Sequence, residues 1–200
     1  MVAHSVSSPI HTESTWEGAR HYAHAIYSAL GFDGVYLGDV VNRHLGQSHE
    51  MMRTIATMAD QMFSAISDIP LLTEFIIRIY RASSNSQAYE LARNVGILRS
   101  VITDDHDFLG VSERIVKGTK AENISLLIEC MVHLKSAGHE LSFPVMCIMA
   151  KFSDKDKLEA ILNKPKAELE QMTERDIIES FSWKPILNAQ ARGISEPITR

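Results

Sequence analysis

Nine histidines make metal ligation the first chemistry to consider for this chain. His21 and His24 are three positions apart on one face of an expected helix, and His44 and His49 lie on either side of an expected helix break. Neutral imidazoles at such spacings can ligate Zn²⁺ or another transition metal. A metal site between helices also needs further ligands, often from repeated Glu-x-x-His pairs, and the sequence repeats no such pair. We therefore expect surface or boundary histidines and predict no cofactor.

The densest polar cluster is Asp-Asp-His-Asp at 104–107, in which His106 and Asp107 are further candidate metal ligands. Residues on either side extend it to a His…His-Asp…Asp order, with His44 or His49 before it and Asp154 or Asp156 after it. That order of residue types is similar to the one in metal-dependent HD-type phosphohydrolases, and the resemblance implies such a hydrolase as an alternative function. The competing interpretation is structural. Carboxylates are unfavourable at a helix C-terminus, so the cluster would lie in a loop or cap the following segment.

Nucleophilic catalysis has no signature in the sequence. There is no G-x-S-x-G motif, and the two cysteines, Cys130 and Cys147, lie in apolar runs. Cysteine in such runs packs like a small hydrophobic residue, so we expect buried free thiols and no reactive thiolate. The absence of catalytic motifs favours a non-enzymatic protein.

Arginine supplies a candidate phosphate-binding surface. Arg78, Arg81, Arg93 and Arg99 could converge across two adjacent helices, and the planar guanidinium group suits phosphate as well as carboxylate. The net charge of −5 and the pI near 6.0 argue against a dedicated nucleic-acid binder, because such proteins usually carry a basic field. Nucleic-acid binding through an Arg/Lys surface is therefore an alternative prediction.

Methionines gather on one expected helix, where Met51, Ile55, Met58 and Met62 alternate spacings of four and three. This is a narrow a/d seam of about two heptads, and methionine is frequent at adaptable binding surfaces. One interpretation is ordinary intramolecular core. The other, which is our leading prediction, is an interaction site for a protein partner or a homo-oligomer, in an adaptor, regulatory or accessory role.

Length and composition fit an ordinary intracellular domain. Two hundred residues correspond to about one domain, with 45% hydrophobic and 22% charged residues and a mean hydropathy of −0.06. The first residues lack the basic and apolar regions of a secretory signal. No apolar stretch reaches the ~18–20 residues that span a bilayer. We expect a cytoplasmic protein that has no contact with a membrane.

Apolar spacings of three and four predict helices almost throughout. They are expected over 16–30, 36–45, 48–65, 70–81, 88–102, 112–117, 122–136, 145–152, 155–162, 165–172 and 177–181. No strand pattern and no repeat of fixed period are visible. The fold class is therefore all-α, a multi-helix bundle or orthogonal array of about eight to ten helices. A mobile arm over 1–13 precedes a helical domain over 14–183, and a tail follows over 184–200. A sub-boundary near 103–120 is suggested because all nine lysines lie at or after Lys117.

Overall fold

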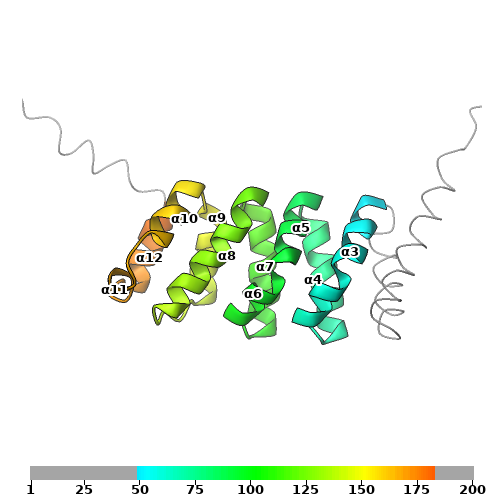
Figure 1. Ribbon diagram of the computed structural model, residues 1–200, viewed down its shortest axis with the longest axis horizontal. Coiled ribbons are helices and arrows are strands. Elements are labelled where there is room, and N and C mark those ends of the chain that lie inside the picture. The colour runs from blue at the N-terminus through cyan, green and yellow to red at the C-terminus, as the bar shows by residue number, and fades with distance from the viewer. Residues whose placement is uncertain (1–48, 183–200) are drawn as a thin grey trace, which may run out of the picture.

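The computed structural model describes residues 49–182, except for the side chains of His49 and Met52. The arm expected over 1–13, the helices expected over 16–30 and 36–45, and the tail expected over 184–200 lie outside the described residues. Within residues 49–182 the chain forms ten α-helices and no strand (Figure 1). The all-α prediction is confirmed. No helix in this part of the chain is long and apolar enough to cross a membrane.

The helices follow one another with short connections. Their bounds are α3 His49–Ala65, α4 Ile69–Ala82, α5 Asn85–Arg93, α6 Val95–Val101, α7 Asp105–Gly118, α8 Ala121–Ser136, α9 Phe143–Phe152, α10 Lys155–Leu162, α11 Lys166–Leu169 and α12 Glu174–Phe181. The predictions over 70–81, 122–136 and 155–162 match α4, α8 and α10 closely. The helix expected over 165–172 is wrong in length, because only the single turn of α11 is helical there.

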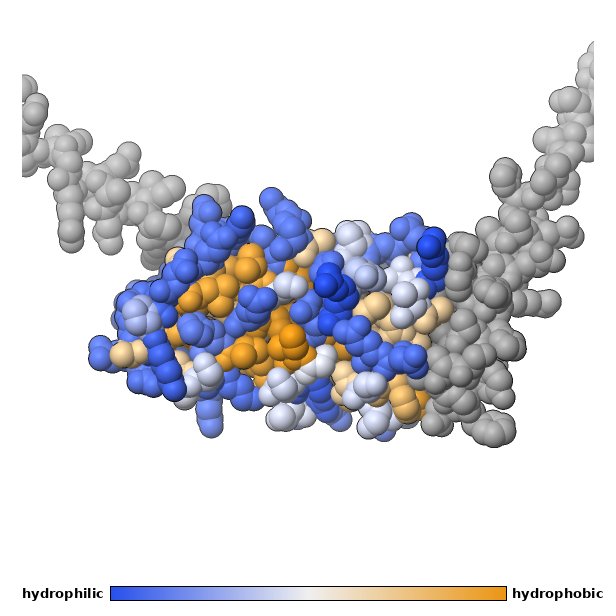
Figure 2. Space-filling view, viewed as in Figure 1, coloured by the Kyte–Doolittle hydropathy of each residue, from blue (hydrophilic) through white to orange (hydrophobic). Residues whose placement is uncertain are grey.

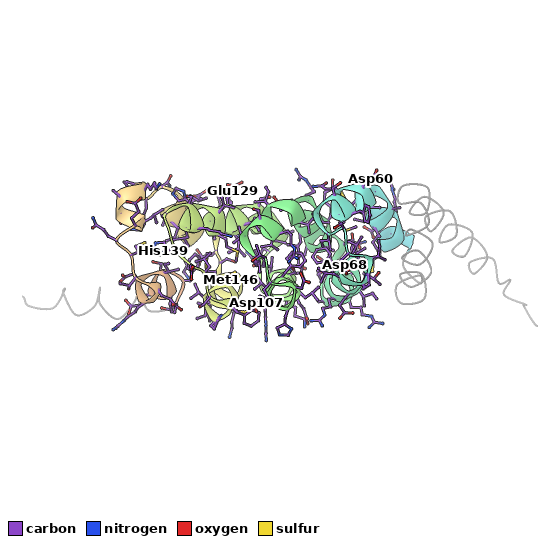
Figure 3. The ribbon with its side chains drawn as sticks, turned by 90° about the horizontal axis from the view of Figure 1, so that it is seen from below. Asp60, Asp68, Asp107, Glu129, His139 and Met146 are labelled. Carbon is purple, nitrogen blue, oxygen red and sulfur yellow. The ribbon has the colours of Figure 1, made fainter. Side chains whose placement is uncertain are left out.

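The helices stack side by side in two layers (Figures 1 and 3). In the first layer α3 packs against α5 and α6, these pack against α8, and α8 packs against α10. In the second layer α4, α7, α9 and α12 pack in that order. Figure 3 looks along the layers, with Asp60 and Glu129 in the first and Asp68, Asp107 and Met146 in the second. The described chain is thus an elongated stack of helical hairpins.

The stack has a structural period that the sequence does not display. The first-layer helices α5, α8 and α10 begin at residues 85, 121 and 155, which are 36 and 34 residues apart. The second-layer helices α4, α7 and α9 begin at residues 69, 105 and 143, which are 36 and 38 apart. Stacking of similar hairpins on their neighbours is the arrangement of α-solenoids, which use extended surfaces for binding.

The acidic cluster at 104–107 begins a helix. Asp104 is the N-cap of α7, and its carboxylate accepts a hydrogen bond from the backbone N–H of Asp107 at 2.9 Å. Asp105 and Asp107 lie in the first turn, where negative charge interacts favourably with the helix dipole. The structural interpretation of the cluster is therefore confirmed. The short helix expected over 112–117 is wrong, because α7 is fourteen residues long.

The helix expected over 88–102 is bent into α5 and α6 at Asn94. The Asn94 side-chain amide donates to the Glu90 carbonyl oxygen at 2.8 Å and to Ser125 Oγ of α8 at 3.0 Å. Gln61 of α3 donates to the Arg93 carbonyl oxygen at 2.6 Å. Side chains thus replace part of the helical hydrogen-bond ladder, which accounts for the bend. The bend was not predictable from apolar spacing, which continues unchanged across it.

Candidate functional site

Two glycines on α7 set its position against α9. A Cβ built on Gly110 would lie 2.7 Å from Phe143 Cε2, and one built on Gly118 would lie 2.8 Å from the Ala150 carbonyl oxygen. Thr119, directly after α7, donates from Oγ1 to the same Ala150 oxygen at 2.9 Å. Gly110, the earlier of the two glycines, meets the start of α9, and Gly118 meets residues near the end of α9. The two helices therefore run parallel.

A groove of about 530 Å³ lies between α7 and α9. Its lining combines an apolar floor with a cationic rim. The apolar lining residues are Phe143, Pro144, Ile148 and Phe152, the cationic ones are Arg114, Lys117 and Lys151, and Gly118 and Cys147 complete it. No carboxylate lines this groove. Its volume lies within the range of sites that hold small ligands or anchoring side chains.

Two of the three rim cations are unneutralised. Within residues 49–182, neither Arg114 nor Lys151 forms an ion pair with a carboxylate. The Lys151 ammonium lies over the ring of Phe152, 5.0 Å from the ring centroid. This cation–π contact holds the charge beside the apolar floor. The groove is therefore an apolar hollow with available positive charge at its edge.

The third rim cation, Lys117, is paired with a carboxylate. Its ammonium donates to Glu113 one turn earlier on α7. This hydrogen bond from Lys117, together with the charges of Lys117, Arg78 and Arg114, lowers the pKa of the Glu113 carboxyl against the raising effect of burial. Glu113 also lies 3.8 Å from Arg78 of α4. Lys117 is the only one of the three with a carboxylate partner in the described structure.

A second hollow adjoins the groove at Lys117. It occupies about 370 Å³ between α4 and α7, and its lining contains the cations Arg78, Arg81 and Lys117 with the carboxylates Glu74 and Glu113. The Arg78 guanidinium donates to Glu74 at 2.6 Å. The positive charge of this hollow is thus largely compensated, whereas the charge of the α7–α9 groove is not. The α7–α9 groove is the stronger candidate site.

Cys147 lies in the groove but is not a reactive thiol. It is half-buried and unpaired. Burial raises its pKa; the charge of Arg114 lowers it and that of Asp107 raises it. Burial also raises the pKa of Cys130, to about 12. Burial thus favours the protonated form of both thiols, whereas the thiolate is the nucleophilic form. Cys130 is buried, as predicted, but Cys147 is only half-buried.

The methionine seam packs inside the protein. Ile55 and Met62 are fully buried, Met58 is 5% exposed, and Met51 is partly buried against the same core. These side chains are placed as core residues and present little surface to a partner. Within the described structure the seam is therefore intramolecular core, the first of the two interpretations.

The four arginines of the predicted phosphate surface do not form one patch. Arg78 and Arg81 lie together on α4, whereas Arg93 ends α5 and Arg99 lies on α6 in the other layer. Arg93 pairs with Glu90 at 3.3 Å. Arg99 pairs with Asp105 and lies over the Phe108 ring at 5.1 Å. Each of these two guanidinium groups is thus used within the chain.

Residues 49–182 contain no group of three or more metal-ligating side chains, and His106 of the predicted set is exposed at the start of α7. Asp154, a residue of the HD-like order, caps α10 by accepting from Lys157 N at 3.0 Å. Three other histidine candidates, His21, His24 and His44, lie outside the described residues. The side chain of the fourth, His49, is not described. The described part of the chain thus brings no metal ligands together.

The first-layer face carries scattered apolar surface. Figure 2 shows apolar patches among charged side chains on this face. The exposed large apolar residues of the described structure are Tyr89, Ile97 and Val132, on α5, α6 and α8. These three residues lie singly on three helices, and none of them lines the α7–α9 groove.

The sequence predicts no site from the groove residues, and among them Cys147 is expected only as a buried thiol. The signal that could have found them is the pair of glycines in an otherwise helical segment, because glycine inside a helix usually has a packing reason. Gly110 meets the Phe143 side chain, and Gly118 meets the backbone of α9. Comparison of the chain with family models, curated proteins and solved structures finds no match.

Proposed function

We propose that this chain is a non-enzymatic helical protein that binds a segment of another protein in the groove between α7 and α9. The observation that carries the proposal is an apolar lining beside the cations Arg114 and Lys151, which form no ion pair within residues 49–182. Buried apolar anchors supply most of the affinity at protein interfaces, and charge at the rim supplies orientation and association rate. An adaptor or regulatory role is consistent with such a site.

Protein binding is favoured over nucleic-acid binding by the balance of charge. Nucleic-acid sites neutralise many phosphates, and this chain has a net charge of −5. The groove offers three cations, of which Lys117 is already paired, beside four apolar side chains. That proportion suits a segment with a few carboxylates and an apolar anchor better than a phosphate backbone.

The test is selection of peptides from a displayed random library on the full chain, followed by affinity measurement with fluorescence anisotropy. Two groove variants locate the site, and each has a control variant that makes the same kind of substitution elsewhere on the surface. Lys151→Glu and Ile148→Asp alter the groove, whereas Arg53→Glu on exposed α3 surface and Val132→Asp on α8 alter the first layer. Circular dichroism melts verify that each variant is folded.

Selected peptides should bind the wild type, Arg53→Glu and Val132→Asp equally, and lose at least tenfold in affinity with both groove variants. Binding that is lost with the first-layer variants and kept with the groove variants would overturn the proposal. So would salt-dependent retention of single-stranded RNA or DNA by the wild type, lost in Lys151→Glu, when no peptide is selected. A mass that rises with concentration and is unaffected by Lys151→Glu would assign self-association to another surface.

A further inference from the structure

The two walls of the groove are both helices, and this restricts the conformation of any peptide that fills it. The backbone N–H and C=O groups of α7 and α9 are bonded within their own helices. An extended peptide against the apolar floor would find no backbone partners there, and buried unpaired backbone groups are costly. A helical peptide satisfies its own backbone. The groove therefore favours a helical occupant.

The axis of the groove follows α7 and α9. Its lining on α9 runs from Phe143 to Phe152, ten residues whose nine steps correspond to roughly 13 Å at ~1.5 Å per residue. That length matches about two and a half turns of a helix laid along the groove. Such a helix would place apolar side chains at i, i+3 or i+4, and i+7 against the floor, as helix-in-groove complexes do.

The charge along the groove is polarised. Lys117 and Lys151 lie at the C-terminal ends of the parallel helices α7 and α9, and Arg114 lies one turn earlier on α7. Toward the opposite end, Phe143 and Pro144 begin α9 and Asp107 lies in the first turn of α7. One end of the groove is thus cationic, and the other is apolar with an aspartate nearby.

We infer that the partner segment is an amphipathic helix whose first turn is acidic and which docks antiparallel to α7 and α9. Carboxylates are favourable in the first turn of a helix, so an acidic N-terminus both stabilises the peptide helix and meets Lys151, which forms no ion pair within residues 49–182. The antiparallel direction also sets the positive end of the peptide dipole beside the negative C-terminal ends of both walls. The apolar turns that follow would then contact Ile148 and Phe143. This inference rests on the proposed function.

The experiment uses three synthetic peptides of about sixteen residues with blocked termini. The first has two glutamates in its first turn and leucines at i, i+3, i+4 and i+7. The second has the same composition with the glutamates moved to the last turn, and the third has lysines in place of the first-turn glutamates. A covalent link between i and i+4 on the polar face equalises helicity, which circular dichroism verifies. Affinity for the full chain is measured by anisotropy.

The first peptide should bind roughly three- to tenfold tighter than the second, with the third weakest. In Lys151→Glu the difference between the first and second peptides should shrink, and the third should gain. Equal affinity of the first two peptides would overturn the inference, and so would preference for the second. If library-selected peptides bind in the groove but are extended or proline-rich, the inference fails and the proposed function stands. If neither the synthetic nor the library-selected peptides bind the wild type, the inference and the proposed function both fail.

Discussion

Gly118 of α7 lies directly against the backbone of α9, where a Cβ would approach the Ala150 carbonyl oxygen to 2.8 Å and Lys151 Cα to 3.1 Å. Because glycine has only a hydrogen atom in place of a side chain, the two helices can approach closely at this end of the groove. Thr119 Oγ1 donates to the same oxygen at 2.9 Å and lies 3.1 Å from Ser153 Oγ, which fastens the contact. The position of Lys151 over the groove therefore depends on a residue without a side chain on the neighbouring helix.

Gly118→Ala should destabilise the protein by roughly 1–3 kcal/mol, because a backbone oxygen cannot move aside as a flexible side chain can. Alanine has the higher helix propensity, so any loss of stability has to come from the clash. Thermal and urea denaturation would measure the change. The same substitution should weaken peptide binding in the groove, since α9 has to shift to accommodate the methyl group.

Gly96→Ala provides the matched control on α6. A Cβ there would lie 3.8 Å from Ala65 Cβ, which is an ordinary contact, and Gly96 is exposed. This substitution should leave the free energy of unfolding unchanged or raise it by up to ~1 kcal/mol, because glycine is unfavourable inside a helix. If both alanine variants change stability equally, the close packing of α7 on α9 is not what Gly118 serves.

Glu113→Gln should reduce the loss of stability on acidification. The Lys117 hydrogen bond lowers the pKa of Glu113, so its stabilising contribution is present above the unfolded-state pKa and is lost as pH falls through the lower folded-state pKa. Melting temperatures between pH 7 and pH 3 should therefore fall less steeply in this variant than in the wild type. Glu140→Gln, at an exposed carboxylate without an ion pair in the described structure, should keep the wild-type slope.

The sequence predicts the helices well where each is determined by its own residues. The apolar ladder between 122 and 136 and the proline at the start of α4 suffice for those two helices, because spacing and caps are local. The α5–α6 bend is different, since Gln61 and Ser125 belong to neighbouring helices more than thirty residues away. Long-range hydrogen bonds of this kind leave no local pattern.

The groove was beyond sequence reasoning for a related reason. Its walls come from residues 114–118 and 143–152, and α8 lies between them in the chain. Only the structural period of the stack brings these segments together, and that period is carried by helix lengths and connections, with no repeated motif. In the sequence, Asp154 and Asp156 follow Lys151 closely and could neutralise its charge. Asp154 instead caps α10 and pairs with Lys157.

Thr173→Ala should cost about 1 kcal/mol through loss of the cap of α12. Thr173 Oγ1 accepts from Asp176 N at 3.2 Å, and Asp176 Oδ2 accepts from Thr173 N at 2.7 Å, so the two residues form a capping box. Thr173→Ser retains the hydroxyl and should stay within a few tenths of the wild type. Equal destabilisation by both substitutions would mean that the threonine methyl group, and not the cap, matters.

Tyr80→Phe should leave stability at neutral pH unchanged or raise it. Tyr80 is 1% exposed, and its hydroxyl has no hydrogen-bond partner within the described structure. A buried polar group without a partner costs free energy, so its removal without loss of ring packing is not destabilising. Tyr89→Phe, at a side chain that is 38% exposed, is the matched control and should have no effect. A clear loss of stability in Tyr80→Phe would indicate a bound water or another partner for the hydroxyl.

The same substitution should change the response to alkaline pH. Burial raises the pKa of Tyr80 above its ordinary value of 10.0, so the unfolded chain ionises first as pH rises. The contribution of Tyr80 to the free energy of unfolding is fully present below pH 10. It is lost progressively above pH 10, because the unfolded state then releases a proton that the folded state keeps. Urea denaturation between pH 8 and pH 11 should therefore show a shallower decline in Tyr80→Phe than in the wild type. Tyr89→Phe should follow the wild-type curve, and identical slopes in all three proteins would contradict the burial of the Tyr80 hydroxyl.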